Sequence, residues 1–101
     1  MIVKMYVVHD SAVKVFLPAP QTLFARTHGE AERNFRAVVN DPKSGHLHNH
    51  PEQFTLFYVG DYDDETGVPT PRNAPEAILS GAQAKETENV LPLPNRGSNG
   101  A

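Results

Sequence analysis

The stretch from residue 50 to residue 67 constrains the fold of this chain more than any other. Its centre, residues 54–62, is dense in aromatic and β-branched residues, which favour the pleated surface of a β-strand. Apolar side chains occupy both alternating faces of this strand: Phe54, Leu56 and Tyr58 on one, Phe57 and Val59 on the other. Such a strand lies at the centre of a sheet, or places one face in the core and the other against a partner chain.

An acidic turn follows this strand and predicts a β-hairpin. In residues 63–67 the Asp side chains can hydrogen-bond the local backbone, and Gly67 can adopt a positive φ. The return arm begins at Val68. Because proline has no amide hydrogen to donate to a sheet, we expect Pro69 and Pro71 to stop this arm early.

Two shorter strands are expected near the start of the chain. Residues 2–9 and residues 12–17 both show the alternation of a strand, and Asp10 and Ser11 between them favour a turn. These segments predict an antiparallel hairpin, which Pro18 prevents from continuing.

Residues 28–40 carry the pattern of one amphipathic helix. Thr27 and Glu30 have the spacing of a capping box, in which the hydroxyl accepts a first-turn amide and the acid reaches back. Glu32 and Arg36 are spaced for an i,i+4 ion pair on the outer surface. A single apolar stripe is formed by Ala31, Phe35, Val38 and Val39. We expect this stripe to cover one face of the sheet.

The sequence therefore predicts an α+β fold. A small antiparallel sheet, made of an N-terminal hairpin plus a longer central strand and hairpin, is covered by one main α-helix. This single domain spans residues 1–84, with a loop over 43–51 and a short helix within 74–84. Polar residues, Pro and Gly dominate residues 85–101, which we expect to form a flexible tail.

Composition and charge exclude several classes of protein. The chain has no cysteine, which excludes disulfides and thiolate metal sites. It has no apolar run approaching the roughly 20 residues of a membrane span, so we expect no membrane partner. Twelve acidic against nine basic residues give a net charge of −3. Dedicated DNA-binding domains are usually basic, so a DNA contact here needs a local cationic patch or an oligomer that concentrates one.

His46, His48 and His50 place three imidazoles within five residues, enough donors for a zinc or nickel site. On an extended segment all three would point to one side. No closed set of structural zinc ligands accompanies them, so we expect adventitious metal affinity and no resident metal or other cofactor. The chain also lacks a nucleophile elbow, a phosphate loop and a paired-carboxylate signature, and we expect no catalytic residue and no enzyme activity.

Basic residues cluster around the expected helix. Arg33 and Arg36 lie three positions apart on one flank, so their side chains share a surface. Arg26 precedes the helix and Lys43 follows it, which extends the row at both ends. Such a row can track the phosphates of a nucleic acid, whereas the alternative is an ordinary solvated surface.

The first two strands offer a second candidate surface. Their even positions hold Lys4, Tyr6, Lys14 and Phe16. On a shared face these residues would combine charge with stacking surfaces, as single-strand binders do. The alternative is that Tyr6 and Phe16 pack in the core. The candidate nucleic-acid-binding residues are therefore Arg26, Arg33, Arg36, Lys43, Lys4, Lys14 and Tyr6.

Several motifs together carry a family resemblance. His-Pro-Glu-x-Phe-Thr-Leu-Phe at 50–57 precedes Gly-Asp-Tyr-Asp-Asp-Glu-Thr-Gly at 60–67. Upstream are Val-His-Asp-Ser at 8–11 and Leu-Phe-Ala-Arg-Thr-x-Gly-Glu-Ala at 23–31. In order and spacing these pieces resemble the small non-structural protein of gokushovirus-type microviruses (Microviridae), bacteriophages with small single-stranded DNA genomes. The resemblance covers roughly residues 1–80.

This resemblance implies a DNA-binding protein of the host cytoplasm. Such a protein helps to turn DNA replication towards single-strand production and packaging, and the resemblance implies no catalytic residues. The acidic net charge favours a second hypothesis, an adaptor that contacts a phage or host replication or assembly protein without binding DNA. Binding that falls steeply with salt separates the two hypotheses.

The two apolar faces of the central strand also predict a homodimer. One helix covers only one face of a sheet, and soluble monomers usually avoid large exposed apolar patches. A two-fold dimer buries the same patch twice and duplicates the cations around the helix.

The composition of the tail leads to a first prediction. Residues beyond Lys85 bury too little apolar area to offset the entropy lost on ordering them, so truncation there leaves the thermal transition intact. Circular dichroism melting of the truncated and full chains measures this. A large drop in melting temperature would instead mean that Leu91 and Leu93 dock on the core.

Overall fold

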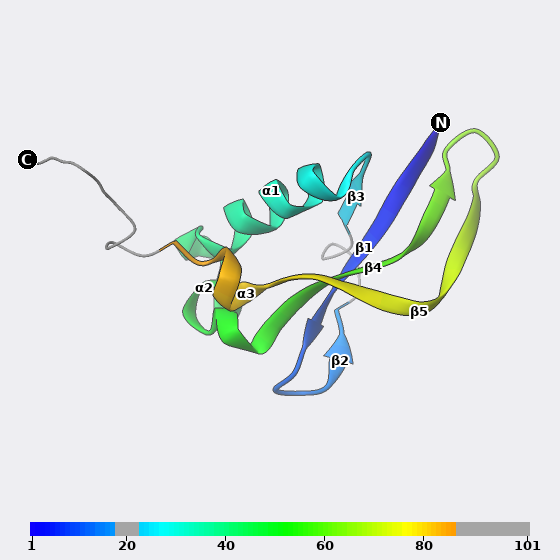
Figure 1. The fold of residues 1–101 in the computed structure, drawn as a ribbon. Helices are drawn as coiled ribbons and strands as arrows, with labels where there is room; N and C mark the ends of the chain where they lie inside the picture. Colours follow the sequence, from blue (N-terminus) through cyan, green and yellow to red (C-terminus); the bar gives the residue numbers. More distant parts are fainter. Residues whose placement is uncertain (18–22, 87–101) are drawn as a thin grey trace, which may run out of the picture.

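The computed structural model of the chain describes residues 1–17 and 23–86. Within them a curled antiparallel sheet carries helices on one side, and the confirmed class is α+β (Figure 1). The expected stop at Pro18 and residues 87–101 of the expected tail, with Leu91 and Leu93, lie outside the described residues. The first two residues of the tail predicted at 85–101 are described: the Lys85 amide donates to the Gly81 carbonyl at 2.9 Å, and the Glu86 amide donates to Asn40 Oδ1 at 2.8 Å.

The sheet is built on two long central strands. Its strands are β1 (Ile2–Asp10), β2 (Val15–Phe16), β3 (Leu23–Ala25), β4 (Phe54–Asp63) and β5 (Val68–Ser80). The order is β2-β1-β4-β5, and β3 pairs with β1 as well, so β2 and β3 share one edge of β1. All these pairings are antiparallel, and the N-terminal hairpin expected from the sequence is present.

The second arm of that hairpin is much shorter than expected. Residues 11–14 form a turn, and only Val15 and Phe16 pair with β1. The reason lies in the start of the turn, where the Ser11 amide donates to the Gln53 carbonyl at 2.8 Å. At its end Lys14 adopts a positive φ of 60°, which no strand residue can hold.

The return arm β5 contradicts the expectation that prolines would stop it. It has 13 residues, and Pro69 and Pro71 are paired with Tyr62 and Gly60 of β4. Proline is tolerated because β5 is an edge strand, where half of the amide positions face away from the sheet. The regular pairing of β5 with β4 is interrupted by a register shift after Pro71, and pairing resumes at Glu76.

Helix α1 (His28–Val39) matches the predicted helix closely. The Thr27 hydroxyl accepts the Glu30 amide at 3.1 Å, as expected of an N-cap. The Glu30 carboxylate reaches one residue further back than a capping box requires and accepts the Arg26 amide at 2.8 Å. This bond fixes the chain where β3 turns into α1.

The expected loop over 43–51 is instead a run of short helices. These are η1 (Pro42–Ser44), α2 (His46–Asn49) and η2 (Pro51–Gln53). Asp41 begins the run by accepting the Lys43 amide at 3.0 Å, and Leu47 anchors it in the core.

The expected helix within 74–84 is confined to α3 (Gly81–Ala84), because residues 74–80 continue β5. Ser80 and Gln83 form its capping box. Gly81 is required here because a Cβ would collide with the Pro51 carbonyl. This close approach fastens the end of the domain to the segment before β4.

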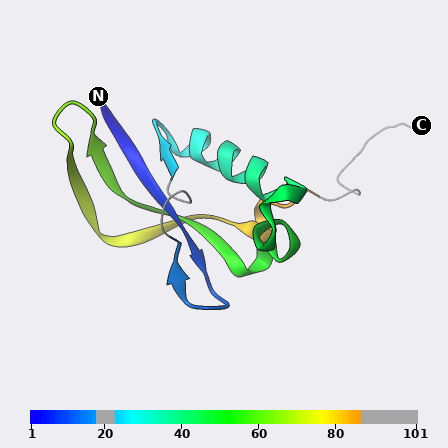
Figure 2. The same cartoon turned by 180° about the vertical axis from the view of Figure 1, so that it is seen from behind.

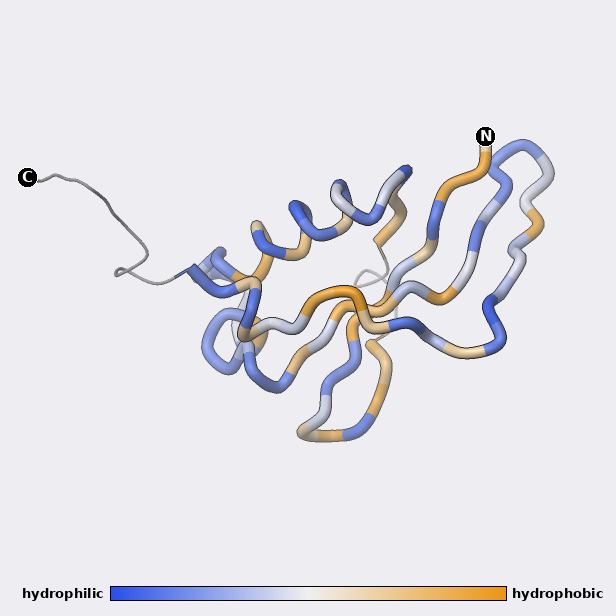
Figure 3. The backbone as a smooth tube through the Cα atoms, viewed as in Figure 1, coloured by the Kyte–Doolittle hydropathy of each residue, from blue (hydrophilic) through white to orange (hydrophobic). Residues whose placement is uncertain are grey.

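All buried strand residues point to the same side of the sheet as the helices. Helix α1 contributes Ala31, Phe35 and Val39 to a core whose strand members are Tyr6, Val8, Ala25, Phe54, Leu56, Tyr58 and Leu79. Figure 3 shows apolar segments running along the middle of the sheet, and Figure 2 shows the same fold from behind. We call the side of the sheet away from α1 the outer face. Its register-paired residues are Met5 with Phe24, His9 with Phe16, Val3 with Tyr62 and Val7 with Phe57.

Phe35 provides the sharpest test of this architecture, since only 1% of its surface is exposed. Phe35→Ala removes the ring from the centre of the helix–sheet contact and should lower the free energy of unfolding by about 3–5 kcal/mol. Urea denaturation measures the change. Ile2→Ala is the control, because Ile2 is 59% exposed and its loss should cost less than about 1 kcal/mol. Equal effects of the two variants would contradict the one-sided core.

Candidate nucleic-acid interface

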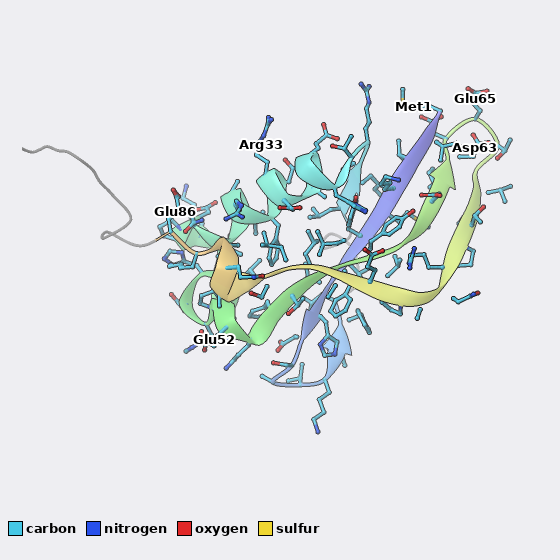
Figure 4. The ribbon with its side chains drawn as sticks, viewed as in Figure 1. Met1, Arg33, Glu52, Asp63, Glu65 and Glu86 are labelled. Atoms are coloured by element: carbon cyan, nitrogen blue, oxygen red, sulfur yellow. The ribbon has the colours of Figure 1, made fainter. Side chains whose placement is uncertain are left out.

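The four cations expected around the helix are all exposed in the structure. Arg26 lies between β3 and α1, Arg33 and Arg36 lie on α1, and Lys43 lies in η1 just beyond it. We call these four residues the cationic row. Figure 4 shows Arg33 directed away from the sheet. The row therefore follows the helical layer from one end to the other, as its positions in the sequence predicted.

No member of the row has a carboxylate partner within the described residues. The salt bridges there join the N-terminal amine to Asp64 and Glu65, and Arg72 to Glu76. The expected pair between Glu32 and Arg36 does not form. Arg36 instead donates to the carbonyl of Gln83 at 3.2 Å, which ties α1 to α3. The charges of the row therefore remain available to an external anion.

The candidates on the first two strands do not form one surface. Tyr6 is completely buried, so its ring is not available to stack on a base. Lys4 lies on the same side as Tyr6, and Lys14 lies in the turn before β2. Phe16 pairs with His9 and so belongs to the outer face. The expected mixture of Lys4, Tyr6, Lys14 and Phe16 on one face is therefore wrong.

A cluster of cations and aromatics surrounds Tyr58. The Lys4 Nζ and the Arg72 guanidinium lie 5.3 Å and 5.2 Å from the centroid of its ring. Its hydroxyl donates to Asp61 Oδ1 at 2.5 Å, and this hydrogen bond raises the pKa of Tyr58. Sequence analysis missed Arg72, since it lies in the arm that was expected to end at Pro71. Both cations are attracted to the π face of the ring, which holds them beside the sheet.

Tyr6 and His28 connect the sheet to the first turn of α1. The Tyr6 hydroxyl donates to His28 Nδ1 at 2.5 Å when that nitrogen carries no proton. Burial raises the pKa of Tyr6 to about 12, with a further contribution from the nearby Tyr58 and Asp61. The hydroxyl therefore remains protonated and serves as a structural donor.

The three histidines after α1 lie on helix α2, which contains His46 and His48 and has His50 as its C-cap. His46 and His50 stack one turn apart, with ring centroids 6.1 Å from each other. His48 turns inward, where its Nδ1 lies 2.9 Å from the Val39 carbonyl oxygen. The Lys85 ammonium donates to the backbone carbonyl of His48 at 3.3 Å. The extended arrangement with all three on one side is therefore wrong. In residues 1–17 and 23–86 no group of three potential ligands is placed to hold a metal ion.

The hairpin between β4 and β5 ends in an acidic tip, which we define as Asp63, Asp64 and Glu65. Asp64 and Glu65 accept from the N-terminal amine at 2.7 and 2.9 Å and raise its pKa (Figure 4). Asp63 accepts the Glu65 amide, and this bond lowers the pKa of its carboxyl. The tip stays negatively charged and repels a nucleic acid.

The outer face carries aromatic rings in contact with one another. Phe16 lies 5.5 Å from Phe57 and 4.7 Å from His9, measured between ring centroids. Further along, Phe24 and Tyr62 lie 5.8 Å apart. None of the register-paired residues that define this face is Lys, Arg, Asp or Glu. The face therefore offers apolar and aromatic contacts and few groups that bind phosphate.

An apolar pocket of about 270 Å³ lies between the end of α1 and α2. Val38, Leu47 and Phe54 line it together with Asp10 and His46. Asp10 accepts the Ala12 amide at 2.9 Å, and Ser44 also lines the pocket.

The comparison with known families adds one finding. The model of a family described as Phage ORF5 protein matches residues 3–84. The chain belongs to this family. The match includes every strand and helix described above except the first residue of β1, and it confirms the resemblance to phage proteins at that level. No curated protein and no solved structure matches the chain. In the described part of this phage protein, no helix is long and apolar enough to cross a membrane.

The buried Tyr6 hydroxyl gives a pH prediction. In the unfolded chain the phenol ionises near pH 10, whereas in the folded chain its pKa is about 12. Between these values the unfolded state binds fewer protons, so the stability that this phenol contributes is complete below about pH 10 and falls as the pH rises towards 12. Urea denaturation across this range should show a smaller loss for Tyr6→Phe than for the natural chain. Equal losses would mean that other groups cause the alkaline transition.

Proposed function

We propose that this phage protein is a non-structural accessory protein of a gokushovirus-type microvirus that binds single-stranded DNA in the host cytoplasm during genome synthesis or packaging. The observation that supports this proposal is the cationic row, with four exposed basic side chains and no carboxylate partner among the described residues. An unpaired guanidinium or ammonium gains most from a phosphate, since no internal ion pair must break first.

The distribution of charge restricts where the DNA lies. The acidic tip repels phosphates at one end of the sheet, and the outer face offers few cations. The helical layer, where the cationic row lies beside Glu30 and Glu32 of α1, is therefore the surface that we assign to the DNA strand. With so few phosphate contacts and a net charge of −3, the affinity is low and depends strongly on salt.

The outer face supports a second candidate function, that of an adaptor for a phage or host replication or assembly protein. Phe16 and Phe24 are about half exposed, and each contacts a further ring of the same face, Phe57 and Tyr62 respectively. Aromatic residues are enriched and charges depleted at the centres of protein interfaces. An adaptor uses this face and leaves the cationic row without a role in binding.

Fluorescence anisotropy with labelled single-stranded DNA at several salt concentrations separates these functions. The natural chain should bind with an affinity that falls as salt rises, by a log–log slope of about 0.7 for each phosphate contact. Arg33→Gln combined with Arg36→Gln should lower both the affinity and this slope.

Arg72→Gln is the matched control for that experiment. Arg72 is an exposed arginine like Arg33 and Arg36. Unlike them, it pairs with Glu76 at 3.5 Å and lies over the ring of Tyr58. Its loss should change the slope less than the loss of Arg33 and Arg36. DNA affinity that is absent at low salt, or unchanged in the Arg33 and Arg36 variant, would reject the row as the binding site.

A further inference from the structure

We infer that the outer face of the sheet is the interface of a two-fold homodimer. This inference goes beyond DNA binding and stands independently of it. The helices and the core lie entirely on the other side, and within residues 1–17 and 23–86 no helix packs on this face. What covers it must therefore be argued from the chemistry of the face itself.

The outer face has the apolar and aromatic composition found at the centres of protein interfaces. Phe24 and Phe16 expose 54% and 45% of their surfaces, and Val7 lies along β1 between their pairing partners Met5 and His9. A soluble chain that leaves such a surface uncovered loses the favourable free energy of burying it. Its aromatic rings already touch in pairs, so they lose little conformational freedom when a partner covers them.

A second copy of the chain fits this face because the face carries no charge that would repel itself. In a two-fold interface the same patch meets its own copy, so every charged group near the axis faces a like charge. The register-paired residues of the outer face include none of the four charged residue types, and their titratable members are His9 and Tyr62. The self-contact therefore avoids the repulsion that charged sheet faces suffer.

The two ends of the face differ in charge, and this sets the orientation of the partner. Strand β1 begins beside the acidic tip and ends at Asp10, whose carboxylate accepts the Ala12 amide at 2.9 Å in the turn that carries Lys14, so this second end has one formal charge of each sign. A two-fold axis in the plane of the interface, perpendicular to the strands, lays the acidic tip of one copy over the Lys14 turn of the other. The parallel alternative would bring the two acidic tips together. Charge complementarity therefore selects the antiparallel arrangement.

The size of the face agrees with a dimer of moderate affinity. The 10 residues of β4 extend about 34 Å, and four neighbouring strands span about 19 Å. The outline of about 600 Å² is somewhat below the usual 800 Å² or so that each partner buries in a stable interface. We therefore expect dissociation in the micromolar range. In this dimer the two α1 helices lie on opposite outer surfaces, so two cationic rows remain accessible.

Size-exclusion chromatography with light scattering tests the inference on the full chain. At concentrations of tens of micromolar the natural chain should have twice the monomer mass of 11.1 kDa. Phe24→Glu places a charge among the exposed aromatic residues of the face, at its β3 edge, and should give a folded monomer. Ile2→Glu is the matched control, because Ile2 is 59% exposed on the same sheet but on the opposite side, and it should remain dimeric.

Orientation is tested by exchanging charges at the two ends. Lys14→Glu should weaken dimerisation about 2-fold to 30-fold, since two symmetry-related surface contacts are lost, and adding Glu65→Lys should restore it. A natural chain that is monomeric at these concentrations overturns the dimer. If Phe24→Glu stays dimeric, or Ile2→Glu dissociates equally, the interface lies elsewhere. A monomeric natural chain whose binding to single-stranded DNA is abolished by Phe24→Glu would assign this face to DNA instead.

Discussion

The structure depends on the burial of one face of the β1–β4 pair beneath α1. Leu56 and Val8 from the two strands and Phe35 from the helix are almost completely inaccessible to solvent, and the remaining core residues surround them. Because a sheet has two faces and this chain has only one layer of helices, burial of one face leaves the other uncovered. The cationic row, which lies on the helical layer, and the aromatic outer face are both consequences of this one-sided packing.

A bulge in β4 determines which residues reach each side. Tyr6 pairs with Tyr58, but the preceding residue of β1, Met5, pairs with Gly60, so Val59 is an extra residue in β4. After one extra residue the alternation of a strand is reversed. Asp61 therefore lies on the helical side, where it accepts the hydroxyl of Tyr58, and Tyr62 moves to the outer face.

Local patterns were sufficient to predict the elements whose stabilising contacts are periodic. Strand β1, strand β4 and helix α1 have the boundaries expected from alternation and capping within about one residue. The segment after α1 could not be predicted because its short helices depend on distant contacts, such as the burial of Leu47 and the approach of Gly81 to Pro51. The start of strand β5 at Val68 was predicted, but its length was underestimated, because tolerance of proline depends on lying at an edge, which sequence alone does not reveal.

For the candidate site, the positions of the cations on α1 followed directly from helical spacing. The prediction that Tyr6 and Phe16 share a face was wrong. Even-numbered residues of one strand need not lie on the same face of the sheet as even-numbered residues of the next strand. The register pairs Phe16 with His9, an odd position of β1, so Phe16 lies opposite to Tyr6. Register across a turn depends on how many residues the turn uses, and here the turn extends to Lys14.

The prolines of β5 have a consequence for the behaviour of the chain in concentrated solution. An exposed strand edge normally offers a ladder of amide donors to which another chain can add a strand. Pro69, Pro71 and Pro75 interrupt that ladder, and the opposite edge of the sheet ends in the short strands β2 and β3. Neither edge supports the continuous strand addition from which fibrils grow. The chain can thus have an apolar outer face that its own helices leave uncovered and still be protected against amyloid-like polymerisation.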